Sequence, residues 1–149
     1  MNILISACLL GVNCRYDGGG KLIDEIDQLK KTYNLIPVCP EVYGGLQTPR
    51  EPAEIIDGKV MNRKGEDVSE NFTRGANETL HLAKLYNCKY AILKERSPSC
   101  GFGEVYDGTF SGNLIKGNGF TAELLSKNGI KVIGESEIDS FLKGGLEEL

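Results

Sequence analysis

The sequence has little of what several common site types and membrane anchors require. It contains no tryptophan and one histidine, His81, which falls in the middle of an expected helix beside its apolar face, so we do not expect it to bind a metal. No stretch reaches the roughly 18 apolar residues of a membrane-spanning helix. The apolar first ten residues are too short to span a membrane and lack a basic leader. We therefore expect a cytoplasmic protein without a membrane partner.

Basic residues are also in short supply. The chain has 17 Lys and Arg against 21 Asp and Glu, a formal net charge of −4 and a pI of about 5.1. A general nucleic-acid binder needs a basic surface that displaces counterions from phosphates. We expect no stable nucleic-acid partner, although a small anionic ligand can still bind locally at a helix N-terminus or an arginine.

The five cysteines are an odd number, in a chain where no secretion signal is expected. A reducing cytosol keeps thiols free, so disulfides are a poor explanation for them. Metal ligation or thiol chemistry is the better expectation for any that cluster. Nineteen glycines also indicate loops that turn sharply or approach a ligand closely.

The length of 149 residues suits a single domain, 1–149, with a hydrophobic core. Short apolar runs alternate with amphipathic segments, which predicts parallel strands joined by right-handed crossover helices. The expected fold is a three-layer Rossmann-like or flavodoxin-like α/β sandwich. It includes a small β-hairpin insertion at 53–61 that turns at Asp57-Gly58. The expected strands are 2–7, 35–38, 89–93 and 131–133. Helices are expected at 22–33, from a capping box at 67–70 to about 86, at 118–128 and at 136–142. Gly129 is the expected C-terminal cap of the third helix.

Three cysteines follow three of these strands. Cys8 comes after the first, Cys39 after the second and Cys100 in the loop after the third, so all three are expected at the carboxyl edge of the sheet, where ligands bind. One such cysteine alone is often a small buried hydrophobe, but three at one edge favour a ligand site. Cys88 lies at the opposite edge, and we interpret it as a packing residue. We interpret Cys14 as structural, in preference to a spare ligand or a redox-active thiol.

Thiolates without histidine favour an iron–sulfur cluster or zinc. Structural zinc usually has four ligands in paired C-x-x-C units, which this chain lacks. Three separated thiolates suit a cubane cluster with one iron left open, but the spacing alone leaves other hypotheses standing. These are a metal-free thiol oxidoreductase or sulfur carrier that uses Cys8 and Cys14, and a non-enzymatic nucleotide- or zinc-binding module.

Polar residues accompany the cysteines at the same edge. Glu41, two residues beyond Cys39, is a candidate general acid or base, and Ser97 and Ser99 precede Cys100, where serines also commonly form turns. Further candidates for substrate binding are Arg15, Arg50 and the segment Asn118, Gly119 and Thr121. That segment opens a helix whose backbone N–H groups, if free, would bind a phosphate; an ordinary helix cap is the alternative.

Four ordered motifs together resemble the thiouracil desulfidase family, short single-domain bacterial proteins formerly grouped as a domain of unknown function. They are the segments 6–11 and 14–18, 37–41, 44–46 with 49–50, and Lys94 with 97–101. The resemblance covers essentially the whole chain. It implies a Rossmann-like fold and a [4Fe–4S] cluster bound by three cysteines. It also implies conversion of a thiouracil-type base, or its nucleoside monophosphate, to the oxo form with release of sulfide.

The resemblance also assigns roles to residues. It implies Cys8, Cys39 and Cys100 as cluster ligands and Glu41 and Ser97 as catalytic residues, with Ser99 as the alternative position for the serine. The small-molecule partner it implies is a thiolated pyrimidine. Some relatives carry an additional C-terminal domain and act on thiolated tRNA, and because this chain ends at Leu149 we expect a small substrate.

Overall fold

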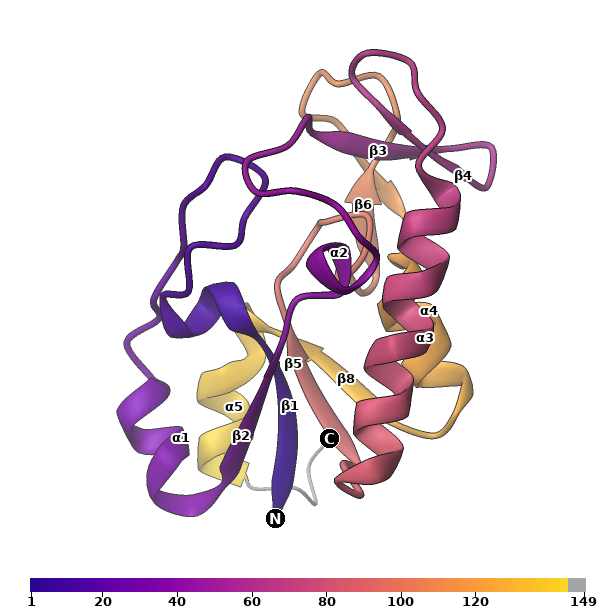
Figure 1. The fold of residues 1–149 in the computed structure, drawn as a ribbon. Helices are drawn as coiled ribbons and strands as arrows, with labels where there is room; N and C mark the ends of the chain where they lie inside the picture. Colours follow the sequence, from indigo (N-terminus) through magenta and orange to yellow (C-terminus); the bar gives the residue numbers. More distant parts are fainter. Residues whose placement is uncertain (145–149) are drawn as a thin grey trace.

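A computed structural model describes residues 1–144 (Figure 1). Its centre is a sheet of four strands, β1 (Asn2–Ser6), β2 (Asn34–Val38), β5 (Tyr90–Leu93) and β8 (Lys131–Gly134). Every pairing between them is parallel, and their order is β2-β1-β5-β8. The predicted parallel α/β sheet is confirmed.

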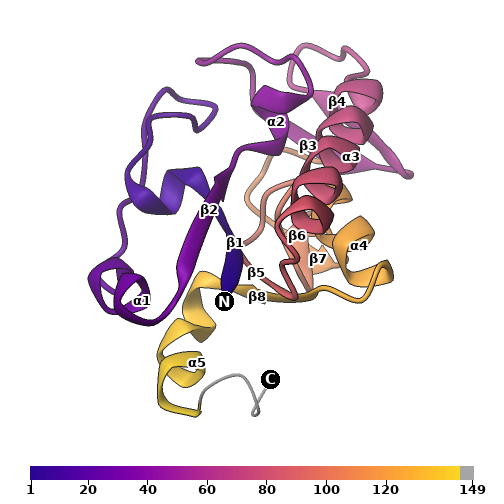
Figure 2. The ribbon, with the colours of Figure 1, turned by 60° about the horizontal axis from the view of Figure 1, so that its bottom comes forward.

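Helices cover both faces of this sheet (Figures 1 and 2). Helices α1 (Ile26–Thr32) and α5 (Ile138–Gly144) pack on one face, and α3 (Ser69–Leu85) and α4 (Phe120–Lys127) pack on the other. The predicted three-layer sandwich is therefore confirmed. None of the helices within 1–144 is long and apolar enough to cross a membrane.

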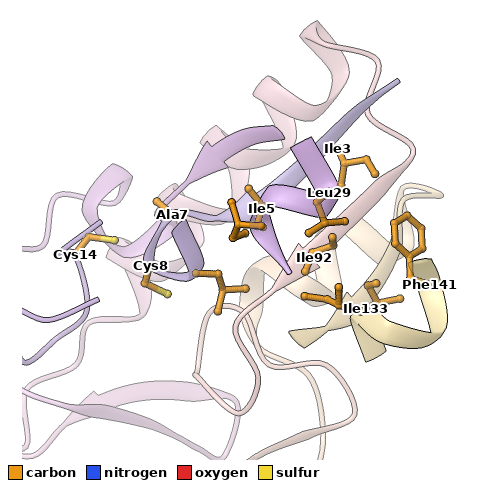
Figure 3. Packing of buried hydrophobic residues seen from close by; sticks show 12 residues of the cluster. Ile3, Ile5, Ala7, Cys8, Cys14, Leu29, Ile92, Ile133 and Phe141 are labelled. Atoms are coloured by element: carbon orange, nitrogen blue, oxygen red, sulfur yellow. The ribbon is translucent and has the colours of Figure 1, made fainter. Parts of the chain in front are cut away.

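The alternation of side chains along β1 explains how one strand supports two core layers. Ile3 and Ile5 are fully buried on the face covered by α1 and α5, where they share a cluster with Phe141 (Figure 3). Leu4 points the other way and shares a cluster with Leu125 of α4. Successive residues of a strand face opposite sides, so a continuous apolar run is what a sheet buried on both faces requires.

Two antiparallel hairpins extend beyond the sheet. The predicted one consists of β3 (Ala53–Ile56) and β4 (Lys59–Asn62), and both of its turn residues have positive φ, 50° at Asp57 and 78° at Gly58. The second consists of β6 (Glu104–Tyr106) and β7 (Leu114–Lys116) and is not among the predicted elements. Its strands have three residues each, too few for a readable alternation pattern.

Some predicted boundaries are wrong. The helix predicted from 22 begins only at Ile26, and Leu22 is 66% exposed, so its apolar side chain does not continue the buried stripe. The strand predicted to reach Ala7 ends at Ser6, since Ala7 opens a 3₁₀ helix, η1 (Ala7–Leu10). The capping box is absent, because the Asp67 carboxylate accepts the N–H of Ser69 instead of completing a reciprocal pair with Glu70.

Candidate active site

The site lies where the strand order of the sheet reverses. From β1 the chain crosses to β2 on one side, whereas β5 and β8 lie on the other. Such a switch point leaves a crevice beyond the carboxyl ends of the strands. A cavity of about 280 Å³ occupies this position, lined by residues that follow β1, β2 and β5 and by residues of both hairpins.

Four of the five cysteines line this cavity. Cys8 lies on η1 directly after β1, Cys39 directly precedes the short helix α2 (Pro40–Tyr43), and Cys100 lies in the loop after β5. The fourth is Cys14, and all of them are free thiols. The prediction that these three cysteines meet at the carboxyl edge of the sheet is therefore confirmed. Their function as ligands stays a prediction.

Burial of these thiols changes their acidity. Desolvation, followed by the nearby Cys100 and Cys14, raises the pKa of Cys8 to about 12. Desolvation also raises the pKa of Cys100 to about 11, although hydrogen bonds from the Ser6 and Ser99 hydroxyls act in the opposite direction. Thiolates so close together would repel one another. An iron cation deprotonates the thiols that coordinate it, and its positive charge offsets the repulsion between the resulting thiolates. The donor set therefore fits a cluster that soft thiolates bind.

The spacing of these donors differs from that of a site for a single ion. Within residues 1–144, no three His, Cys, Asp or Glu side chains are arranged to hold one metal ion. A tetrahedral zinc site needs its ligands within about 2.3 Å of one atom. In a cubane cluster each cysteine binds a different iron, so the ligands can lie further apart.

Cys14 is held mainly through its backbone. Its carbonyl oxygen accepts a hydrogen bond from Arg50 Nη2 at 2.9 Å and one from the Cys39 thiol at 3.7 Å. Burial, followed by the neighbouring Cys39, raises the pKa of the Cys14 thiol to about 12. A dithiol oxidoreductase needs a thiol whose pKa is lowered, so the hypothesis of a Cys8–Cys14 dithiol is not favoured.

Close helix packing fixes the position of Glu41. This residue lies in the first turn of α2, a helix of only four residues. A side chain on Gly75 of α3 would collide with the backbone of Pro40, and one on Gly44 would collide with the backbone of Asn71. The Asn71 side chain also donates to the Gly44 carbonyl at 2.8 Å. Glycine at these two positions lets α2 lie directly against α3.

Two donors orient the Glu41 carboxylate from opposite sides. Arg50 Nε donates to Oε1 at 3.2 Å, and Ser99 Oγ donates to Oε2 at 2.9 Å. The Glu41 and Arg50 side chains are 18% and 8% exposed, respectively. A charge-assisted contact in such a partly dry environment is stronger than one at the surface. The acid–base candidate therefore has one defined orientation beside the cysteines.

Comparisons with known proteins show to which family this chain belongs. The family model for 2-thiouracil desulfurase matches residues 3–137. The chain belongs to the 2-thiouracil desulfurase family. It is 46% identical over 150 residues to YbbK, an uncharacterized protein of Bacillus subtilis (strain 168), in an alignment that covers 94% of this chain and 99% of YbbK.

A solved structure is similar as well. The [4Fe-4S]-dependent thiouracil desulfidase TudS superposes with a TM-score of 0.91 at 42% identity, covering 99% of each chain. The resemblance inferred from the sequence motifs is therefore confirmed, together with the Rossmann-like fold built on a four-stranded parallel sheet.

Both serines expected from the family motif lie at the site, with different contacts. The Ser97 hydroxyl accepts the backbone N–H of Cys100 at 2.8 Å and lies 3.4 Å from the Ser99 hydroxyl. Ser99 is 1% exposed and, besides bonding Glu41, lies 3.5 Å from the Cys100 sulfur. The hydroxyls of Ser97 and Ser99 and the Glu41 carboxylate thus form a continuous chain along which a proton can pass.

The two arginines expected to bind substrate differ in their availability. Arg50 lines the cavity, but its guanidinium also donates to the Gln47 carbonyl and the Thr48 hydroxyl, so most of its N–H groups are used within the protein. Arg15 lines the cavity too, and no other side chain among residues 1–144 bonds its guanidinium. Arg15 is therefore the more available cation of the two.

The predicted phosphate site at 118–121 depended on free N–H groups, and these are not free. The N–H of Gly119 donates to the Gly101 carbonyl at 2.7 Å, and the N–H groups of 120–122 donate to the carbonyls of Pro98 and Ser99. Asn118 bonds Gly103 and Glu123. Asn118, Gly119 and Thr121 do not line the cavity of the cysteines. The start of α4 instead anchors the loop that carries Cys100, and the helix has no side-chain cap.

Some residues of the site carried no readable signal in the sequence. Ser6 lies inside an apolar run, yet its hydroxyl accepts the Lys94 N–H at 2.9 Å and donates to the Cys100 sulfur at 3.5 Å. Arg63 and Phe110 come from the two hairpins, and the Arg63 guanidinium lies 5.6 Å from the centre of the Phe110 ring. Only the folding of both hairpins over the sheet edge brings these residues to the cavity.

Proposed function

We propose that this chain is a [4Fe–4S]-dependent desulfidase that converts a thiouracil-type base, or thiouridine monophosphate, to the oxo form with release of sulfide. The observation that supports it most is the placement of Cys8, Cys39 and Cys100 around one cavity, beside a carboxylate that Arg50 and Ser99 orient. The cavity belongs to a chain of the 2-thiouracil desulfurase family. TudS, which has the same fold, is described as a [4Fe-4S]-dependent thiouracil desulfidase.

Cys8, Cys39 and Cys100 are the residues that would hold the cluster. A cluster bound by three cysteines has one iron without a protein ligand, and this iron supplies a soft Lewis acid for a thiocarbonyl sulfur. The overall reaction is a hydrolysis. Water adds its oxygen to the ring carbon, the carbon–sulfur bond breaks, and sulfur leaves as hydrogen sulfide, so no external electron donor is needed.

The contacts of Glu41 with Arg50 and Ser99 support a role as general base. Its carboxylate accepts a proton from water as the oxygen attacks the ring carbon. The proton must then reach the departing sulfur, and the hydroxyls of Ser99 and Ser97 lead from Glu41 toward the Cys100 loop. Arg50 keeps the carboxylate pointed into the cavity by holding Oε1.

The cavity and the charge of the chain favour a small substrate. A volume of about 280 Å³ lies just below the usual range for small-molecule pockets, so it favours a small substrate over a bulky one. A structured tRNA would meet a protein of net charge −4. Arg15 at the cavity is available to a substrate phosphate, a role that rests on its lack of a side-chain partner within 1–144.

Anaerobic reconstitution with iron and sulfide followed by a desulfidation assay tests this proposal. We expect a broad visible absorption band, about four irons and four labile sulfides per chain, and sulfide release from 2- or 4-thiouracil with formation of uracil. Stoichiometric zinc without labile sulfide, or a loaded cluster without turnover of any thiopyrimidine, would contradict it.

A further inference from the structure

Glu54 is a buried carboxylate to which the proposed reaction gives no role. It lies on β3, is 8% exposed and lines the cavity that the cysteines line. A buried carboxylate carries a large desolvation penalty unless hydrogen bonds compensate it. An apolar residue would suit a purely structural strand position better, so the contacts of Glu54 decide what it does.

Only one oxygen of Glu54 is used within the protein. Oε1 accepts the backbone N–H groups of Gly108 at 3.0 Å and Phe110 at 3.1 Å, which fastens the β6–β7 loop to β3. Oε2 has no hydrogen-bond partner among residues 1–144. In that part of the chain, Thr121 Oγ1 is the one fully enclosed side-chain polar atom without a partner. Glu54 Oε2 is therefore in contact with solvent, and the cavity that Glu54 lines provides the route.

The hairpins place this oxygen over the sheet edge. In Figure 1, β3 and β6 lie beyond α2, above the carboxyl ends of the strands after which the cysteines come. Phe110, which Glu54 holds by its N–H, and Tyr106 add aromatic walls to the same cavity. A flat ring bound in this cavity therefore has thiol groups on one side and a carboxylate oxygen on the hairpin side.

We infer that Glu54 Oε2 accepts a hydrogen bond from the ring N–H that adjoins the thiocarbonyl group, and so selects thiobases of the uracil type. The inference deepens the proposed function and rests on it. In 4-thiouracil this donor is N3–H; in 2-thiouracil N1–H also adjoins the thiocarbonyl group, and the donor assigned here is again N3–H, which lies between C2 and C4. A carboxylate can only accept, so a base whose N3 carries no hydrogen leaves a desolvated carboxylate oxygen unpaired. Substitution at N1, the attachment point of ribose, does not affect the contact.

Two methylated substrates test this in the reconstituted holoenzyme. We expect kcat/KM for 1-methyl-4-thiouracil to exceed that for 3-methyl-4-thiouracil by about 10- to 100-fold, the loss typical of a hydrogen bond to a charged group. The products 1-methyluracil and 3-methyluracil, measured by equilibrium dialysis, should bind with the same order of preference. Equal values for the two members of each pair would overturn the inference.

The Glu54→Gln variant separates the hydrogen bond from the steric effect of the methyl group. The two backbone N–H groups need an acceptor, so the amide oxygen stays on Gly108 and Phe110 and the amide NH₂ turns into the cavity. We expect the variant to lose about 10- to 100-fold for the 1-methyl compounds and to change little for the 3-methyl compounds. An unchanged preference in the variant would show a purely steric effect and overturn the inference.

Glu51→Gln is the matched control. Glu51 is three residues away on the same segment, pairs with the exposed Lys64 and does not line the cavity, so the methyl preference should stay as in the wild type. The wild-type comparison needs no variant, so a Gln variant that fails to fold leaves the inference testable. An inactive holoenzyme that binds 1-methyluracil over 3-methyluracil would refute the proposed function and still support the role of Glu54.

Discussion

The contact between α2 and α3 predicts the consequence of adding one methyl group. Gly75 lies in the middle of α3, and a side chain there would collide with the oxygen, carbonyl carbon and Cα of Pro40. In an open helix, Gly→Ala stabilises by about 1 kcal/mol. Here all three opposing atoms are backbone atoms, which no rotamer change can move, and overpacking costs about 1–3 kcal/mol or more.

The collision should therefore outweigh the helix propensity, and Gly75→Ala should lower stability by up to about 2 kcal/mol. For a chain of this length that corresponds to a fall in Tm of about 4–8 °C. Thermal unfolding followed by circular dichroism measures it. The exposed Asn77→Ala, half a turn further along α3, is the control, and it should be neutral or slightly stabilising.

The same substitution should impair the site, because Pro40 lies between Cys39 and Glu41. A shift of α2 moves a predicted cluster ligand and the general base together, so cluster content and turnover should both fall in Gly75→Ala and not in Asn77→Ala. A Gly75→Ala protein as stable as the wild type, with normal cluster content and turnover, would refute the packing argument.

Three further predictions concern the site. Cys8→Ala, Cys39→Ala and Cys100→Ala should each abolish the stable cluster absorption, whereas Cys88→Ala, in the core beneath α3, should retain it. Glu41→Gln and Ser97→Ala should retain the cluster and lose about 100- to 10,000-fold in kcat, the range of general acid–base contributions. The loaded protein should release sulfide from thiouracil compounds and leave thiouridine in intact tRNA largely unchanged.

Each of these has an outcome that would contradict it. A cluster that survives loss of Cys100 would remove that residue from the ligand set, and Cys14→Ala would then show whether the fourth thiol replaces it. Near-normal turnover in Ser97→Ala would rule out Ser97 as the catalytic serine and favour Ser99, which donates a hydrogen bond to Glu41. Fast desulfuration of tRNA would refute the arguments from cavity size and charge.

The fold was predictable because its central strands are buried on both faces. Segments 3–5 and 90–93 are apolar without interruption, and this pattern can be recognised in the sequence independently of the loops. The edge rule for parallel sheets then placed Cys8, Cys39 and Cys100 together without any structural information. The errors were at helix ends, where Leu22 fits the helical period but lies outside the helix and exposed to solvent.

The hairpin side of the cavity was not predictable. Glu54, Arg63 and Phe110 reach the site because two small hairpins fold over the sheet edge, and nothing in their local sequence indicates the direction in which a hairpin packs. The supposed phosphate site failed for a related reason. The prediction required free N–H groups at the start of α4, but these groups donate to the carbonyl oxygens of Pro98, Ser99 and Gly101 in the loop after β5.

The contacts of Arg50 have a consequence for how the site assembles. One guanidinium joins the carbonyl of Cys14, the carboxylate of Glu41 and the turn at 47–48, segments that come from different loops. Glu41 is also held by the packing of α2 on α3, whereas Cys14 lies outside any helix or strand. One side chain therefore positions both the general base and the loop of Cys14, so a change at Arg50 should disturb the two together.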